Sequence, residues 1–128
     1  KELKPKEKPR RELQRTLGDL EAMAYLGQYY SAKIRGAVAL AEFDRDGKPE
    51  QQEAAVKHLE IALAHWKHYA DIAHSQYKPQ LLNRIGFVNL HEIAGYVEKD
   101  IAIAKQWQPG TLKDIPPGPR TADVPFRP

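Results

Sequence analysis

Three runs of apolar residues at alternating spacings of three and four constrain this chain more than any other feature. Such spacing places side chains along one face of an α-helix. The first run predicts a helix of about six turns that could begin near Arg10, after Pro5 and Pro9. Its stripe comprises Leu20, Ala24, Gly27, Ile34, Val38 and Ala41, with Ser31 in the one gap.

A turn signal separates the first helix from the second. Residues 44–49 read Asp-Arg-Asp-Gly-Lys-Pro, where Asp-Gly favours a turn and Pro49 suits the first position of a new helix. The second helix should end around Ser75. Its stripe comprises Val56, Leu59, Leu63, Trp66, Ala70 and Ala73.

The third helix is expected to begin after a linker. Residues 76–88 contain Pro79 and Gly86 but also apolar side chains, so the linker should pack on the helices. Asn89 can cap the free amides of the helix, with Glu92 three residues on as its capping-box partner. The stripe comprises Leu90, Ala94, Val97, Ile101 and Ala104.

These stripes predict an all-α fold, a three-helix antiparallel bundle made of a long helical hairpin and a third helix, because amphipathic helices bury one another's apolar faces. The stripes are rich in Ala and Gly, so larger side chains must fill the core. The residues expected to do so are Met23, Leu26, Tyr30, Leu40, Phe43, Trp66, Tyr69 and Tyr96.

The two ends of the chain differ from its centre. Residues 1–16 hold seven basic and three acidic side chains and predict a charged arm or linker. Residues 17–108 form the predicted bundle, with ten basic and twelve acidic side chains. Residues 109–128 include six prolines and predict an extended tail.

Composition excludes several classes of protein. The chain has no cysteine, which excludes disulfides and thiolate metal sites. No apolar run approaches the roughly 20 residues of a membrane span. In the basic arm lysines alternate with glutamates and prolines without aromatic residues, so no nucleic-acid partner is expected. Because the chain starts at Lys1, we expect it to be part of a longer protein.

Histidines on the second helix offer one possible metal site. His65 and His68 are three residues apart and Asp71 follows three further on, which places all three on one face. Histidines exposed at the rim of the bundle are the alternative interpretation. We find no nucleophile or paired carboxylates in a catalytic setting, so no cofactor and no catalysis are expected within this segment.

Two resemblances extend this interpretation. The string Leu26-Gly27-x-x-Tyr30, with Ala39 and Phe43, resembles one tetratricopeptide unit, but the pattern does not recur one repeat later. Residues 18–30, 75–80 and 84–86 are similar to helical regions near the carboxyl end of large exported bacterial glycoside-hydrolase-like proteins. That resemblance covers residues 17–107, and it implies an accessory module beside a catalytic domain in the periplasm or outside the cell.

The resulting expectation is a non-catalytic helical accessory domain of a larger carbohydrate-active protein. It would stabilise the rest of that polypeptide or lend aromatic side chains to a glycan groove. A helical module that binds a partner protein or peptide is the alternative, and the metal-binding bundle is a third. The candidate ligand-binding residues are Tyr29, Lys33, Trp66, Tyr69, Tyr77, Lys78 and Arg84.

Overall fold

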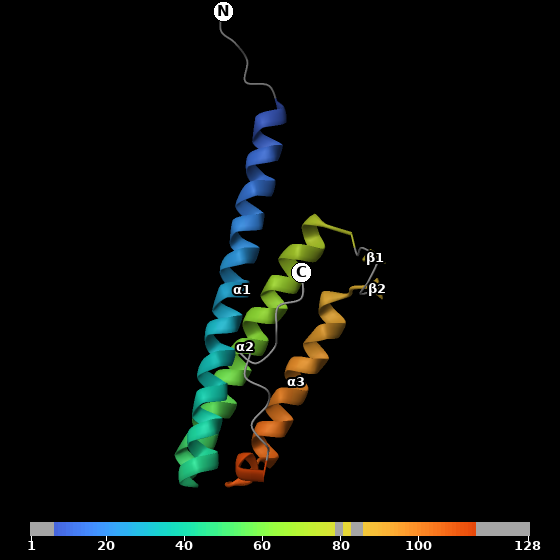
Figure 1. Ribbon diagram of the computed structural model, residues 1–128. Coiled ribbons are helices and arrows are strands. Elements are labelled where there is room, and N and C mark those ends of the chain that lie inside the picture. The colour runs from blue at the N-terminus through green and yellow to red at the C-terminus, as the bar shows by residue number, and fades with distance from the viewer. Residues whose placement is uncertain (1–6, 79–80, 83–85, 115–128) are drawn as a thin grey trace, which may run out of the picture.

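The computed structural model describes residues 7–78, 81–82 and 86–114 and contains three long helices. They are α1 (Glu7–Asp46), α2 (Pro49–Gln76) and α3 (Leu90–Gln106). The helices run antiparallel in sequence order, and α2 packs against both of the others (Figure 1). This arrangement confirms the predicted all-α bundle.

Helix α1 is longer than its stripe predicted. It begins at Glu7, so most of the segment predicted as a charged arm is helical, and Pro9 lies in the first turn, where proline is tolerated. The N-terminal part of α1 extends past the end of α2 (Figure 1). At the other end the predicted turn is confirmed. Gly47 has a φ of 68°, and Pro49 occupies the first turn of α2.

Small side chains let α1 approach α2 closely. A Cβ atom placed on Gly36 would lie 2.9 Å from the Leu59 Cγ atom and 3.3 Å from the Ala55 carbonyl oxygen. Ala55 and Ala62 of α2 are fully buried. The hairpin interface therefore depends on a glycine where the helices meet.

The predicted stripe of α1 was wrong. Its large members Leu20, Ile34 and Val38 are 58%, 62% and 53% exposed, and Ala24, Gly27 and Ala41 are exposed as well. The helix buries its opposite face instead, which bears Ala22, Tyr29, Ala32, Gly36, Ala39 and Phe43.

The stripes of α2 and α3 were correct. Every residue of both is buried or half-buried, including Trp66 of α2 and Val97 of α3. Of the expected core fillers, Phe43 and Trp66 are buried, and Leu26, Leu40 and Tyr69 are half-buried. Three expected fillers were wrong, because they are exposed: Met23, Tyr30 and Tyr96.

Polar contacts hold α3 against α2 at both ends. The Trp66 indole donates a hydrogen bond to the Leu90 carbonyl oxygen at 2.9 Å. Asn89 caps α3 as predicted, since its side chain accepts from the His91 amide at 3.1 Å. At the far end the Gln52 side chain donates to the Ala104 carbonyl oxygen at 2.9 Å. The bonds made by Asn89 and Gln52 satisfy backbone groups that the two ends of α3 leave without partners.

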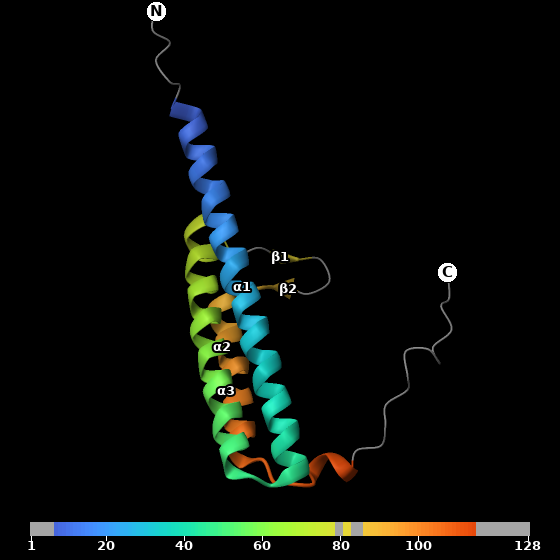
Figure 2. The same ribbon diagram turned by 90° about the vertical axis from the view of Figure 1, so that its left-hand side faces the viewer.

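Short elements of secondary structure flank α3. Between α2 and α3, β1 (Leu81–Leu82) pairs antiparallel with β2 (Gly86–Phe87), a two-residue ladder that the sequence interpretation missed. After α3, the 3₁₀-helix η1 (Thr111–Asp114) lies against the end of α1 (Figure 2). The start of the predicted tail therefore docks on the bundle, and residues 115–128 lie outside the described residues.

Candidate interaction surface

Four of the seven candidate ligand-binding residues lie together, and the three aromatic ones, Tyr29, Trp66 and Tyr69, pack in or against the core. The ring centroids of Tyr29 and Trp66 are 4.9 Å apart, and those of Trp66 and Tyr69 are 5.4 Å apart, each pair packed edge to face. Tyr29 and Trp66 are 6% and 8% exposed. Neither ring therefore offers a free face to a ligand.

Lys33 closes this cluster at the surface. Its ammonium forms an ion pair with Asp100 of α3 at 2.9 Å and donates to the Tyr29 hydroxyl at 3.2 Å. The hydrogen bond from Lys33 to Asp100 raises the pKa of the lysine, against a smaller opposing effect of burial. Lys33 thus joins α1 to α3 and is already engaged within the chain.

Two of the remaining candidates, Tyr77 and Lys78, follow the end of α2. The Tyr77 side chain is exposed, and its hydroxyl donates to the Asp19 carboxylate of α1 at 2.6 Å. This bond raises the pKa of Tyr77 above its ordinary value. Lys78 is exposed, and neither residue belongs to the core cluster. Arg84, the last candidate, lies outside the described residues.

The candidate metal ligands make other contacts. His68 stacks on the Tyr25 ring at 5.0 Å, and His65 lies 6.0 Å from the same ring. Asp71 instead approaches the His91 Nδ1 atom at 3.8 Å. Within the part of the chain that the structure describes, no three His, Asp or Glu side chains form a metal-binding group.

The most unusual surface of the molecule is a run of large apolar side chains along α1, which we call the outer face of α1. It lies on the side of α1 opposite the face that is buried against the rest of the bundle. Each of its large side chains is between 53% and 70% exposed, so no other described segment covers them. They are Leu13, Leu17, Leu20, Met23, Tyr30, Ile34 and Val38.

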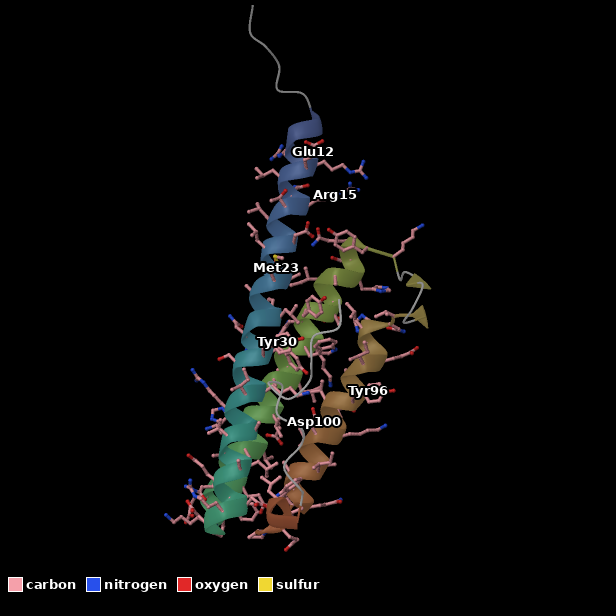
Figure 3. All side chains as sticks on the ribbon, in the orientation of Figure 1. Glu12, Arg15, Met23, Tyr30, Tyr96 and Asp100 are labelled. Atoms are coloured by element: carbon pink, nitrogen blue, oxygen red, sulfur yellow. The ribbon has the colours of Figure 1, made fainter. Side chains whose placement is uncertain are left out.

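The outer face follows a regular seven-residue pattern. From Leu13 to Ala41, residues at alternating spacings of four and three form one continuous stripe, with Ala24, Gly27 and Ser31 at its centre. Two residues per heptad on one face is the pattern of a helix that packs along a second helix. Met23 and Tyr30 lie beside this stripe, seven residues apart, and widen it (Figure 3).

One edge of the outer face is polar. Glu21, Gln28 and Arg35 follow it at intervals of seven residues, and all three are exposed. Among the described ion pairs of the chain, none involves Glu21 or Arg35. Opposite charges therefore lie at the two ends of this edge, both available to a partner.

Elsewhere among the described residues, exposed large apolar side chains do not form a comparable run. Tyr96 and Ile103 of α3 are 65% and 50% exposed but lie about two helical turns apart. The Lys99 ammonium lies 4.9 Å from the centre of the Tyr96 ring. Tyr96 therefore provides an exposed apolar control position outside the outer face of α1.

The sequence interpretation missed the first part of the outer face. Leu13 and Leu17 continue the spacing that begins at Leu20, which was the signal that could have revealed them. Leu13 was assigned to a linker because prolines and charges dominate the first sixteen residues, and Leu17 fell within the predicted bundle but was not included in its stripe.

Comparisons with known proteins give no further guidance. No protein-family model matches this chain, and neither the curated proteins nor the solved structures include a significant match. Among the described residues, no helix combines the length and the apolar character needed to cross a membrane.

Proposed function

We propose that this chain is a helical protein-interaction module whose docking surface is the outer face of α1. The observation that carries the proposal is the continuous run of exposed apolar side chains on a helix that already buries its opposite face. Folded monomers rarely expose contiguous apolar patches larger than a few hundred Å². Side chains exposed by 53–70% contribute on the order of 100 Å² each, so the run is on the order of 700 Å².

The spacing of the run favours a helical partner. Residues 13–41 span roughly 42 Å along the axis of α1, and the alternation of four and three keeps one narrow stripe in line with a second helix. A partner strand or loop would not match this period. The small residues Ala24, Gly27 and Ser31 at the centre allow the two helix axes to come close together.

The wider expectation of an accessory domain in a larger carbohydrate-active protein remains a proposal. If the domain stabilises the rest of its polypeptide, that polypeptide could supply the helix that covers the outer face of α1. The glycan-contacting version relies on aromatic rings, two of which, Tyr29 and Trp66, are buried. The exposed apolar run therefore supports docking of protein more than docking of sugar.

Binding of a designed helix tests the proposal. A synthetic four-heptad peptide with Leu at its apolar positions and alternating Glu and Lys beside them would be titrated into the full chain by calorimetry. We expect binding in the micromolar range, lost in a Leu20→Glu/Ile34→Glu double variant and retained in a Tyr96→Glu control. All three positions are exposed, so each variant should fold.

Two outcomes would contradict the proposal. One is that the wild-type chain, at concentrations where it is monomeric, binds no such helix, and the other is that the double variant binds as well as the wild type. Circular dichroism and thermal unfolding of each variant would establish that lost binding does not reflect lost structure.

A further inference from the structure

We infer that the helix that covers the outer face of α1 is the same helix of a second copy, packed antiparallel about a two-fold axis. This inference rests on the proposed function and names its partner. Three features of the outer face support it: the order of large and small side chains along the stripe, the charges along its polar edge, and the area that pairing would bury.

The order of side-chain sizes is self-complementary in the antiparallel direction. Within the stripe, Leu20 and Val38 flank the small residues Gly27 and Ser31. Antiparallel pairing centred near Tyr29 places Leu20 opposite Val38 of the second copy and Gly27 opposite Ser31 of the second copy. Large residues then meet on both sides of the centre, and small residues meet at the centre, where the axes cross.

The rest of the stripe and the residues beside it fit the same register. Within the stripe, Ala24 falls opposite Ile34 of the second copy, so a small residue faces a large one. On the apolar edge, Tyr30 meets its own symmetry mate, and Met23 meets Ala37 of the second copy. A two-fold interface requires such self-complementarity, because both copies use the same surface. If one residue contacts a second residue of the other copy, that second residue contacts the first residue of the other copy in turn.

Charge distinguishes the antiparallel from the parallel arrangement. In the antiparallel register Glu21 lies beside Arg35 of the second copy, and symmetry repeats this ion pair at the other end. In a parallel pair, residues on one edge contact those five positions later on the partner. Thr16 would then face Glu21 and Tyr30 would face Arg35, which gives no opposite charges.

The buried area is adequate for a stable dimer. With on the order of 700 Å² from each copy, the interface approaches the roughly 800 Å² per partner of a standard protein complex. The outer face lies opposite the buried face of α1, so α2 and α3 of both copies remain on the outside of the assembly. A second copy can therefore reach the whole stripe.

Charge reversal with mixing tests the inference. Glu21→Arg and Arg35→Glu variants of the full chain would be studied by sedimentation equilibrium, separately and as an equimolar mixture. Each single variant replaces two attractive pairs by two repulsive ones, so we expect a dimer weaker by roughly tenfold to thirtyfold. In the mixture, an arginine of the first variant meets a glutamate of the second at both ends of the interface, and the heterodimer should regain wild-type affinity.

Several outcomes would overturn the inference. The first is that the wild-type chain stays monomeric up to about 200 µM. The second is that the single variants dimerise as well as the wild type. The third is that the equimolar mixture forms dimers with no higher affinity than either variant alone. The designed helix separates the two proposals. If the wild type binds that helix but not itself, the second copy is refuted and the interaction module stands. If it binds neither, both are refuted.

Discussion

Replacement of Asp44 should release the segment that follows α3. Asp44 lies near the end of α1 and is 5% exposed. Its Oδ1 atom accepts hydrogen bonds from the Trp107 indole at 2.8 Å and from the Leu112 amide at 3.2 Å, and its backbone oxygen accepts from the Gly110 amide at 2.8 Å. One residue of α1 therefore fastens residues 107–112 to the bundle.

The expected cost of Asp44→Ala follows from these bonds. A hydrogen bond to a charged group contributes roughly 1.5–3 kcal/mol, and a buried donor left without a partner costs roughly 1–3 kcal/mol. The indole of Trp107 is only half-buried and can recover part of the loss through water. We expect the free energy of unfolding to fall by about 2–4 kcal/mol.

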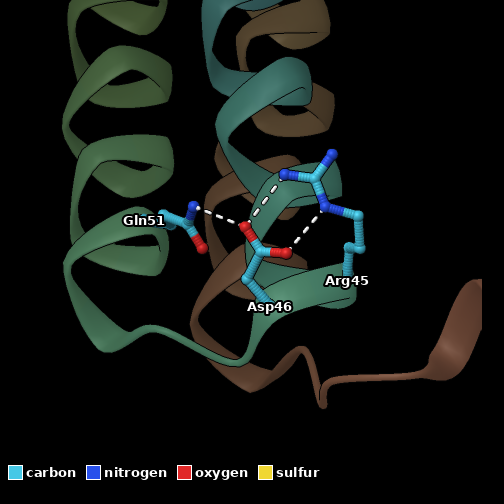
Figure 4. Close-up of polar contacts among 3 residues, drawn as sticks. All are labelled: Arg45, Asp46 and Gln51. Carbon is cyan, nitrogen blue, oxygen red and sulfur yellow. Dashed lines mark hydrogen bonds and ion pairs between the residues drawn. The ribbon is translucent and has the colours of Figure 1, made fainter.

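Asp46 supplies a matched control two residues away. It also accepts three hydrogen bonds, two from Arg45 at 2.7 and 2.9 Å and one from Gln51 at 3.3 Å (Figure 4). The Arg45 guanidinium, with help from Gln51, holds the pKa of the Asp46 carboxyl far below its usual value. Water can replace all three bonds, so Asp46→Ala should change stability much less than Asp44→Ala.

Urea unfolding of both variants, followed by circular dichroism, checks this comparison. Hydrogen exchange at the Leu112 amide gives a local measurement, since it should accelerate in Asp44→Ala and remain slow in Asp46→Ala. Equal losses of stability in the two variants would refute the reasoning, because they would show that burial does not decide the strength of these bonds.

Three further predictions concern contacts between the helices. Gly36→Leu should lower the free energy of unfolding in urea by about 2–4 kcal/mol, because α2 leaves no room for a side chain there; unchanged stability would contradict the packing of α1 on α2. Asp100→Asn should cost less than about 1 kcal/mol at pH 7. The raised pKa of Lys33 means that this difference is present below pH 10.5 and disappears as the pH rises through the folded-state value; a difference that persisted above that value would argue against the ion pair. Asp19→Asn should return the pKa of Tyr77 toward its ordinary value of 10.0, as followed by ultraviolet titration, and an unchanged pKa would exclude the hydrogen bond as its cause.

Periodicity predicted α2 and α3 correctly because each has a single apolar stripe. Leu59 and Trp66 of α2 face Val97 and Ile101 of α3, and the other sides of both helices are mostly polar. Asn89 was also predictable, since capping depends on local chemistry that a short sequence window contains.

Periodicity failed on α1 because that helix has two apolar faces. One carries Tyr29 and Phe43 with small residues between them, and the other carries Leu20 and Ile34. The second is the more regular stripe, so spacing alone selects it. The structure selects the first because Gly36 allows close approach to α2, a tertiary effect that no window within α1 reveals.

The candidate ligand-binding residues were likewise predictable only in part. The aromatic residues of the hairpin were recognised, but whether a ring is buried depends on which face of α1 meets α2. Tyr29 became part of the core and Tyr30 became part of the surface, although the two are adjacent in sequence. Asp44 was assigned only to the turn after the first helix, because the partners that bury it lie more than sixty residues later in the sequence.

The central claim is that the outer face of α1 is covered by another helix. The chain has no cysteine, so a single Ile34→Cys substitution gives a unique thiol on that face, and Tyr96→Cys gives a matched thiol elsewhere. The rate of maleimide labelling would be measured from low to high protein concentration and with the designed helix added. The account predicts that labelling at position 34 slows at least about fivefold under one of these conditions, while labelling at position 96 is unchanged. Equal and constant rates at both positions would contradict it.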